Sequence, residues 1–332
     1  MADAVLVARD LRKSFKAPRR PPVEAVCGVS MEVRRGEIFG FLGPNGAGKT
    51  TTLRMLTTLL PIDSGAATVA GYDVERSPQE VRARIGYVSQ LGGSDELATG
   101  LENLVLQGRL YGDETSAVRR RVAELIELLE LEAFADRTVI TYSGGQRRRL
   151  DVALGIVHAP EVLFLDEPST GLDPQNRANL WSHIAALRAR GTTVFLTTHY
   201  LEEADELCDR LMIIDHGEIV AEGTPRELKR QIAGDTVLLS VRDQDHAAHR
   251  AEQRLRTQPY VRELSVDDTT LRLYVEEGAS AMIEILRLLD SEGIGIQSLT
   301  VAEPTLDDVF LRQTGRSLRD AGQRPETEER RA

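Results

Sequence analysis

The residues most suited to chemistry in this sequence lie in the stretch GPNGAGKTT. It matches the pattern G-x-x-x-x-G-K-[ST] in full, ending in Lys49 and Thr50. Glycines let successive backbone N–H groups turn inward around phosphate oxygens, and a helix that starts there adds its dipole. Lys49 would reach the β- and γ-phosphates of a nucleotide, and the Thr50 hydroxyl would bind Mg²⁺. The predicted phosphate-binding residues are Gly43, Pro44, Asn45, Gly46, Ala47, Gly48, Lys49, Thr50 and Thr51.

A pair of acidic residues, Asp166 and Glu167, ends the apolar run VLFLDEP. A carboxylate at the end of a strand can hold Mg²⁺, usually through water, which suits Asp166. Glu167 could then polarise a water molecule that attacks the γ-phosphate. The alternative is an acidic strand end that faces solvent, but beside a phosphate loop the pair is better interpreted as the second half of one site.

Strands and helices that could position these motifs alternate up to about Glu222. Apolar runs bounded by Gly, Pro or acidic residues predict strands at 37–43, 85–90, 162–168, 192–199 and 211–215. Runs of this kind are typical of strands buried on both faces, so the sheet should be largely parallel, with helices around it. The phosphate loop follows the first strand and opens a helix predicted over 51–60. Residues 117–131 carry apolar side chains at helical spacing, within a mostly helical insertion over about 91–160.

The pattern changes after residues 226–234, which read as a helix end and a linker. The order beyond is strand, helix, two hairpin strands, helix and strand, which is the β-α-β-β-α-β arrangement of ferredoxin-like domains. We therefore expect a nucleotide-binding domain over 1–230 and an α+β ferredoxin-like domain over 235–313. The polar tail, 314–332, is predicted to be disordered, and the cluster APRRPP at 17–22 is predicted to be a loop.

Charge and composition exclude several classes of protein. The 332 residues include 41 Lys and Arg against 52 Asp and Glu, a net charge of −11, which opposes direct binding to nucleic acid. No apolar run approaches the roughly 18 residues of a membrane span, and the charged N-terminus is unlike a signal peptide. Cys27 and Cys208 alone form no disulfide framework and fit a reducing compartment. A soluble cytoplasmic protein is expected, which would reach a membrane only through a partner.

Several further motifs accompany the phosphate loop and the acidic pair. TYSGGQRRRLDVA spans 141–153, YVSQ ends at residue 90, VLFLDEPSTGLDP spans 162–174 and TTHY spans 197–200. Together they resemble the ATP-binding cassette family over about residues 3–225. The resemblance implies a P-loop NTPase fold with a mixed sheet core and a helical subdomain, which binds ATP and Mg²⁺ and hydrolyses ATP.

The resemblance implies that Ser143, Gly144, Gly145 and Gln146 form the family's signature, which binds the γ-phosphate held by the opposite subunit. A hydroxyl, small residues and free N–H groups at a helix N-terminus suit an anion. Tyr142 replaces the family's usual leucine, and this departure should alter packing more than phosphate contact. Because the chain carries one phosphate loop and one signature, two copies would have to meet head-to-tail around two ATP molecules.

Other site residues are also implied by the resemblance. Gln90 would touch Mg²⁺ and the attacking water and would shift with the membrane partner. Asp173 would lie on a loop that crosses the dimer interface. His199 would contact the γ-phosphate and orient Glu167, the catalytic base. Phe15 lies where the family stacks an aromatic ring on adenine, although it could instead be a core phenylalanine.

The C-terminal third narrows the resemblance. A cassette followed by this domain and by TLDDVFL, residues 305–311, is similar to the ATPase subunits of daunorubicin-resistance-type exporters. The likeness implies export of an amphipathic small molecule, such as a drug, an antibiotic or a lipid, through a separate membrane permease. The chain would then lie on the cytoplasmic face of the cell membrane. Leu306, Val309 and Phe310 form one helix face that could pack on its own domain or contact a partner.

Two other functions share the cassette. An importer ATPase is one, although such chains more often carry a barrel-like regulatory extension. A soluble ATPase of DNA repair or of the ribosome is the other. Repair proteins of this type carry coiled coils or zinc-binding cysteines, and ribosomal ones fuse two cassettes through a basic linker. This sequence has none of these features, so export is the favoured interpretation.

Overall fold

The computed structural model divides into two compact units, Met1–Pro225 with Gln313–Ala332, and Arg226–Arg312. The residues that the structure describes are 4–16, 21–112, 114–231, 235–242, 247–302 and 304–318. Most of the predicted loop at 17–22 and the tail beyond Leu318 lie outside this set. Among the described residues, no helix combines the length and the apolar character that crossing a bilayer requires.

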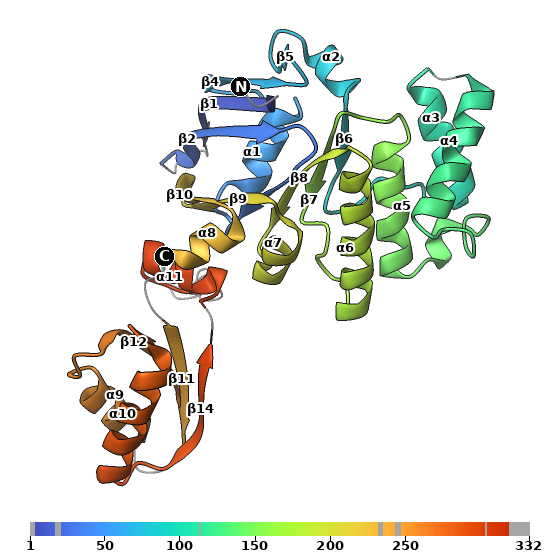
Figure 1. Ribbon diagram of the computed structural model, residues 1–332. Coiled ribbons are helices and arrows are strands. Elements are labelled where there is room, and N and C mark those ends of the chain that lie inside the picture. The colour runs from blue at the N-terminus through green and yellow to red at the C-terminus, as the bar shows by residue number, and fades with distance from the viewer. Residues whose placement is uncertain are drawn as a thin grey trace, which may run out of the picture. The chain divides into compact units, whose positions relative to one another are not determined.

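The first unit contains two sheets (Figure 1). The larger sheet has the order β10-β9-β3-β8-β7-β6, in which β10 is antiparallel to β9 and the other neighbours are parallel. Its strands are β3 (Ile38–Leu42), β6 (Ile85–Val88), β7 (Val162–Asp166), β8 (Thr193–Thr198), β9 (Arg210–Asp215) and β10 (Glu218–Gly223). All five predicted strands are present, and the mixed P-loop sheet is confirmed.

The smaller sheet of this unit is antiparallel, with the order β2-β1-β4-β5. Its strands are β1 (Ala4–Phe15), β2 (Val23–Arg34), β4 (Ser64–Val69) and β5 (Tyr72–Asp73). This sheet was not predicted from the sequence, because its pairing joins segments that are up to 63 residues apart. One example is the alignment of Leu6 with Val69.

The first unit contains the helices α1 (Lys49–Leu56), α2 (Pro78–Arg82), α3 (Gly100–Leu110), α4 (Thr115–Leu128), the 3₁₀ helix η1 (Val139–Thr141), α5 (Gly144–Ile156), α6 (Pro174–Ala189) and α7 (Leu201–Leu207). These helices lie around the larger sheet, except that α3 and α4 lie beyond α5, away from the sheet (Figure 1). The segments from α3 to α5 form the predicted helical insertion between β6 and β7. In α4, Val118, Val122 and Leu125 are buried, as the amphipathic pattern predicts. The helix predicted over 51–60 is wrong at its end: α1 stops at Leu56, and Thr58 turns the chain with a φ of 63°.

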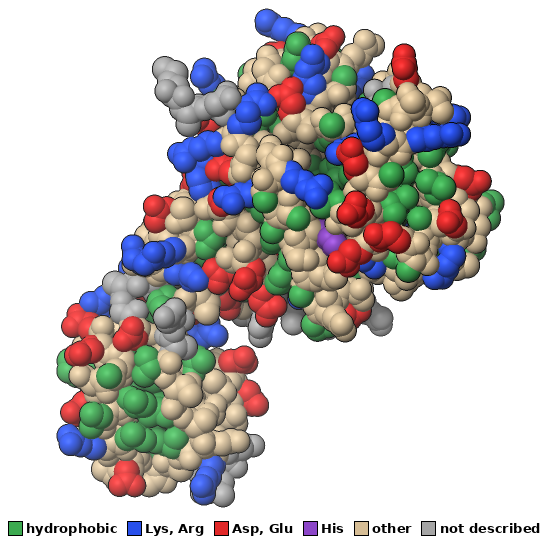
Figure 2. Space-filling model, turned by 45° about the vertical axis from the view of Figure 1, so that its right-hand side comes forward, with side chains coloured by type: hydrophobic (Ala, Val, Ile, Leu, Met, Phe, Trp, Pro, Cys, Tyr) green, Lys and Arg blue, Asp and Glu red, His purple; other side chains and the backbone are tan. Residues whose placement is uncertain are grey.

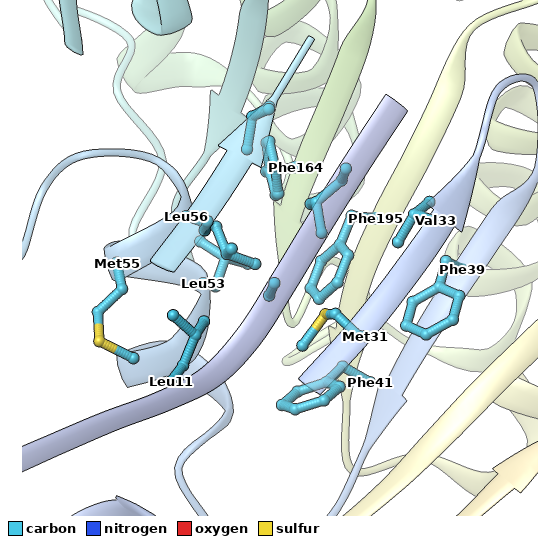
Figure 3. Close-up of a cluster of buried hydrophobic side chains, with 14 of the residues drawn as sticks. Leu11, Met31, Val33, Phe39, Phe41, Leu53, Met55, Leu56, Phe164 and Phe195 are labelled. Atoms are coloured by element: carbon cyan, nitrogen blue, oxygen red, sulfur yellow. The ribbon is translucent and has the colours of Figure 1, made fainter. Parts of the chain in front are cut away.

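A row of phenylalanines packs between the larger sheet, α1 and the smaller sheet (Figure 3). Phe39 of β3, Phe195 of β8 and Phe164 of β7 are aligned in the parallel register of three adjacent strands. The ring of Phe195 lies 5.6 Å from that of Phe39 and 5.5 Å from that of Phe164, and all three residues are fully buried. Met31 of β2 and Leu53 of α1 belong to the same buried cluster. The row therefore fixes the strands whose ends carry the predicted site.

The second unit has the predicted β-α-β-β-α-β order. Its antiparallel sheet runs β12-β13-β11-β14, and its helices α9 and α10 pack on the sheet through Leu239, Leu273 and Ile285. The elements here are α8 (Pro225–Arg230), β11 (Asp235–Val241), α9 (Ala247–Leu255), β12 (Val261–Asp267), β13 (Thr270–Val275), α10 (Gly278–Ser291), β14 (Ile296–Ala302) and α11 (Leu306–Thr314). The C-terminal sheet domain is thus present with its own core.

The TLDDVFL segment forms the start of α11, where Asp308 is a buried hub. Its carboxylate accepts hydrogen bonds from Arg272 (2.8 Å), from the Tyr274 hydroxyl and from the backbone N–H and hydroxyl of Thr305 (both 2.7 Å). Burial and the nearby Asp308 carboxylate raise the pKa of Tyr274 well above its usual range, so the phenol stays protonated and donates. Leu306, Val309 and Phe310 are all buried as well. Of the two readings of this helix face, the structure favours packing.

Removing the Phe195 ring should destabilise the first unit. We expect Phe195→Ala to lower the free energy of unfolding by about 3–5 kcal/mol, because the substitution leaves a cavity at the centre of the row. Phe195→Leu should cost less. Chemical denaturation measures both, with Val23→Ala as a control at a site that is 62% exposed. A loss below about 1 kcal/mol for Phe195→Ala would contradict the central role of the row.

Candidate active site

The phosphate loop runs from the end of β3 into α1. Gly48 caps α1 with a φ of 106°, and a Cβ there would lie 2.3 Å from the carbonyl oxygen of Ala25, so only glycine fits. Lys49 is 4% exposed, and its Nζ donates to the carbonyl oxygens of Gly43 (2.8 Å) and Pro44 (3.0 Å). The loop therefore presents a buried ammonium group at the N-terminus of a helix, a combination that suits phosphate.

Oxygen donors for a cation meet beside this loop. The Thr50 hydroxyl donates to Asp166 Oδ1 at 3.0 Å, and the Thr197 hydroxyl donates to the same oxygen at 2.7 Å. Asp166 is 3% exposed. A hydroxyl and a carboxylate in this position are hard oxygen ligands of the kind that Mg²⁺ prefers, so these residues fit a magnesium ion bound to a nucleotide.

Glu167 lies at the junction of three strand ends. Its φ is 47°, an unusual backbone conformation for glutamate, and its N–H donates to both the carbonyl and the hydroxyl oxygen of Thr197 at 3.1 Å. Its carboxylate lies 3.1 Å from Lys49 Nζ, 3.1 Å from His199 Nδ1 and 3.3 Å from the Thr170 hydroxyl. β7 thus supplies Glu167, β8 supplies His199, and the loop after β3 supplies Lys49.

Charge pairing controls the ionisation of this cluster. Burial alone would raise the pKa of Glu167, but His199 and Lys49 favour the carboxylate more strongly and lower the pKa to about 2. Burial lowers the pKa of Lys49, and the Glu167 carboxylate opposes that shift. At neutral pH Glu167 is therefore a carboxylate, and its charge favours the protonated form of Lys49.

A pocket of about 510 Å³ brings most of the predicted nucleotide-binding residues together. Gln90, Glu167 and His199 face the phosphate loop across it. Its lining residues are Ala25, Asn45, Gly46, Gly48, Lys49, Thr50, Thr51, Gln90, Glu167, Thr170 and His199. Phe15 is not in this lining. Its ring is 43% exposed at the end of β1, so it is not part of the core.

The signature residues form the N-terminus of α5, outside the pocket lining. Ser143 and Gln146 form a reciprocal capping box, in which Ser143 Oγ accepts from the Gln146 N–H and Gln146 Oε1 accepts from the Ser143 N–H. Ser143 and Gly144 are exposed, whereas a Cβ on Gly145 would lie 2.3 Å from Asn176 Oδ1. The helix N-terminus is therefore open to a ligand that arrives from outside the chain.

Two neighbouring positions show how this surface is built. The Tyr142 hydroxyl donates to the carbonyl oxygen of Phe134 at 2.6 Å, and the edge of its ring packs on the Phe134 ring. Tyr142 thus packs inside the helical insertion, and its effect relative to leucine stays a prediction. Asp173 caps α6 by accepting from the Asn176 N–H at 2.9 Å, and these backbone and side-chain bonds to Asn176 lower its pKa.

Sequence reasoning missed Arg148, which connects several of the motifs. Its buried guanidinium donates to the carbonyl oxygens of Pro168 (2.8 Å), Ser89 (2.7 Å) and Asp166 (3.1 Å). Burial lowers its pKa, and nearby carboxylates oppose the shift. Within the run QRRRL, Arg148 looks like one of three solvated arginines, so its type and position alone do not indicate this role. Thr197, which accepts hydrogen bonds from the Glu167 N–H and donates one to Asp166, was missed as well.

Figure 2 shows several hydrophobic side chains exposed to solvent on the helical part of the first unit. Leu91 is 95% exposed and Leu110 is 71% exposed. A second pocket, of about 260 Å³, lies here between Ser89, Gly92 and Tyr111. Exposed apolar side chains around a pocket are typical of a protein-binding surface.

This fold and this arrangement of phosphate loop, acidic pair, histidine and signature define an ATP-binding cassette ATPase. Residues 26–170 match the ABC transporter family, and residues 223–314 match the C-terminal domain of DrrA1-3-like ATP-binding proteins. A solved ATP-binding subunit of an ABC transporter superposes with a TM-score of 0.61 at 28% identity, over 68% of this chain and 92% of that one. A dimeric cassette bound to ADP and phosphate, at 24% identity and a TM-score of 0.61, shares the fold over 66% of this chain and 98% of that one.

Sequence relatives extend the match to nearly the whole chain. The daunorubicin resistance ATP-binding protein DrrA2 of Streptomyces coeruleorubidus is 46% identical over 88% of this chain and 90% of its own. The doxorubicin resistance ATP-binding protein DrrA of Mycobacterium tuberculosis is 43% identical over 94% of both chains. The linearmycin resistance ATP-binding protein LnrL of Bacillus subtilis is 37% identical over 89% and 95%. The chain belongs to the daunorubicin-resistance type of ABC transporter ATP-binding proteins.

The depressed pKa of Glu167 makes stability depend on pH. Its folded pKa, about 2, lies below its ordinary value of 4.5, so the carboxylate stabilises the fold above about pH 4.5 and loses this effect as the pH falls towards 2. We expect Glu167→Gln to cost roughly 1–3 kcal/mol of unfolding free energy at pH 7, and this difference from wild type should shrink below pH 4.5. Denaturation of the nucleotide-free protein across this range measures it. Glu124→Gln is the exposed control, and a pH-independent difference for Glu167→Gln would contradict the assignment.

Proposed function

We propose that this ATPase binds Mg²⁺ and ATP in the 510 Å³ pocket and uses Glu167 as its general base. The phosphate loop and the ammonium of Lys49 would hold the phosphates, and Thr50 and Asp166, with Gln90 nearby, would hold the metal ion. Bound magnesium supplies charge neutralisation on the phosphate oxygens. The buried oxygen pair formed by Thr50 and Asp166, 3.0 Å apart, supports this placement.

The geometry around Glu167 supports its role. The Glu167 carboxylate is ionised, and His199 lies at its Oε2. Thr197 holds the backbone N–H of the same residue. In the reaction, Glu167 would take the proton of the attacking water, and His199 would keep the carboxylate oriented. Lys49 would move from Glu167 to the γ-phosphate, because phosphate offers it a stronger anionic partner.

The observation that carries the dimer is the position of the signature. Ser143 and Gly144 are exposed at a helix N-terminus, and neither lines the pocket that holds Lys49 and Glu167. An anion site and a phosphate loop that do not meet within one chain can meet between two chains. We therefore place Ser143, Gly144, Gly145 and Gln146 of one copy over the γ-phosphate bound by the other. Asp173 would lie at the boundary, and Phe15 would stack on adenine.

The inference of export rests on the names of the relatives. The relatives are named for resistance to daunorubicin, doxorubicin and linearmycin, and related chains are named for Nod factor export. We infer that this chain energises export of an amphipathic small molecule through a separate permease, on the cytoplasmic face of the membrane. The exposed leucines Leu91, next to Gln90 in the sequence, and Leu110 offer the permease an apolar surface. A permease bound there could shift Gln90 and so report its state to the pocket.

Glu167→Gln separates binding from hydrolysis. The variant should bind ATP about as tightly as wild type, because the phosphate loop is unchanged, but its steady-state turnover should fall by about 100-fold or more. It should also accumulate as an ATP-bound dimer. Phosphate release and size-exclusion chromatography measure the two effects, with the exposed Glu202→Gln as the matched control. Turnover at the wild-type rate would show that another group is the base.

Mixed mutants test the shared site. Lys49→Ala should weaken ATP binding roughly ten- to a hundred-fold, because a charge-assisted contact is lost, and Ser143→Arg should block the signature. In a head-to-tail dimer of these two variants, one composite site carries both defects and the other is intact, so part of the ATPase activity should return on mixing.

The matched control mixes Lys49→Ala with Glu167→Gln. Both defects then affect the phosphate-loop half of a site, so each composite site carries one defect and activity should stay low. Equal recovery in the two mixtures, or recovery in neither, would contradict a site shared between copies.

A further inference from the structure

The segment that follows α11 is anchored on the first unit. Arg316 Nη2 donates to both carboxylate oxygens of Asp215 at 3.0 Å and lies 2.6 Å from His216 Nε2. The Asp215 side chain is only 9% exposed, whereas that of Arg316 is 37% exposed, so the carboxylate is shielded from water and the guanidinium only in part. Leu318, two residues further on, is buried. These residues begin the segment that the sequence predicted as a disordered tail, and in the structure Arg316 is fixed to the turn between β9 and β10.

That turn supports the phosphate loop from behind. The N–H of Gly217 donates to the carbonyl oxygen of Ala47 at 2.9 Å. At the other end of the loop, a Cβ on Gly43 would lie 2.3 Å from the carbonyl oxygen of Ile214, so the end of β9 packs directly against the first glycine. His216 and Gly217, with φ of 47° and 81°, form the two-residue loop between the paired residues Asp215 and Glu218, a hairpin turn in which left-handed backbone is usual. The turn is therefore a tight support, and Arg316 contacts Asp215 and His216 in it.

We propose that Arg316 is a positioning residue for the phosphate loop, acting through the turn Asp215–Gly217. Without its cation, the nearly buried Asp215 carboxylate would draw water or move outward, and the turn would relax. Ala47 would then lose its fixed donor, Gly217, and the backbone N–H groups on both sides of Ala47 would no longer converge on one phosphate position. This inference rests on the proposed phosphate-binding role of the loop.

The proposal has a reciprocal consequence. If the Arg316 contact favours the loop shape that binds phosphate, then bound ATP must favour the Arg316 contact by the same free energy. Residues 313–318 lie far from Lys49 in the sequence and contain no predicted ATP ligand. Stabilisation of this segment by ATP, in excess of the general stabilisation that any bound ligand gives the folded unit, would therefore report the coupling itself.

The first experiment compares full-length variants in ATP titrations and in steady-state hydrolysis. Arg316→Ala should raise the Kd and the KM for ATP about three- to tenfold, the range expected for coupling through packed contacts. Its kcat at saturating ATP should stay within about twofold of wild type, because Glu167 and His199 are unchanged. Arg316→Lys should recover most of the affinity, because it restores a cation to Asp215. Arg287→Ala, at a side chain that is 75% exposed in the second unit, is the matched control.

The second experiment needs no variant. Hydrogen exchange of the wild-type protein should slow at residues 313–318 when ATP is added, and this supports the proposal even if Arg316→Ala fails to fold. An unchanged ATP affinity in Arg316→Ala, or an unchanged exchange rate in this segment, would overturn it. Lys49→Ala distinguishes failure of this proposal from failure of the proposed function. If Lys49→Ala binds ATP with wild-type affinity, the phosphate-binding role of the loop fails. If Lys49→Ala binds ATP weakly but Arg316→Ala binds it with wild-type affinity, only the positioning role of Arg316 fails.

Discussion

The site depends on the register of three parallel strands, β3, β8 and β7. Phe39, Phe195 and Phe164 are aligned across these strands. Three or four residues after them come the start of the phosphate loop, His199 and Glu167, respectively. A parallel sheet brings the C-terminal ends of its strands to one edge. Because of this, the phosphate loop meets Glu167 and His199, although it lies more than a hundred residues before them in the sequence.

Burial at that edge makes the charged groups depend on one another. Lys49 is almost inaccessible and Glu167 nearly so, and an unpaired charge in either position would be costly. The ion pair between Lys49 and Glu167 offsets this cost, and His199 lies at the other oxygen of the carboxylate. Because Lys49 and His199 lie on the two carboxylate oxygens of Glu167, the ionisation of each group depends on its neighbours.

Contiguous features could be predicted from the sequence, whereas features made by distant pairing could not. The phosphate loop, Asp166, Glu167 and the five strands of the larger sheet are local patterns of residue type and spacing. Arg148 was hidden in an arginine run, because only tertiary burial distinguishes it from its neighbours. The antiparallel sheet and the Arg316–Asp215 contact join segments about 60 and 101 residues apart, and neither leaves a periodic signal.

The C-terminal part of the chain is connected to the cassette at both of its ends. The chain leaves the first unit after Pro225 and returns to it at Gln313, so the second unit is an insertion with respect to the contacts that define the cassette. The hydrogen bonds of Asp308 and the burial of the apolar face beside it account for the residue types of the TLDDVFL segment by packing alone. The return segment instead contacts the turn behind the phosphate loop. The return segment therefore links the second unit covalently to the turn that supports the phosphate loop.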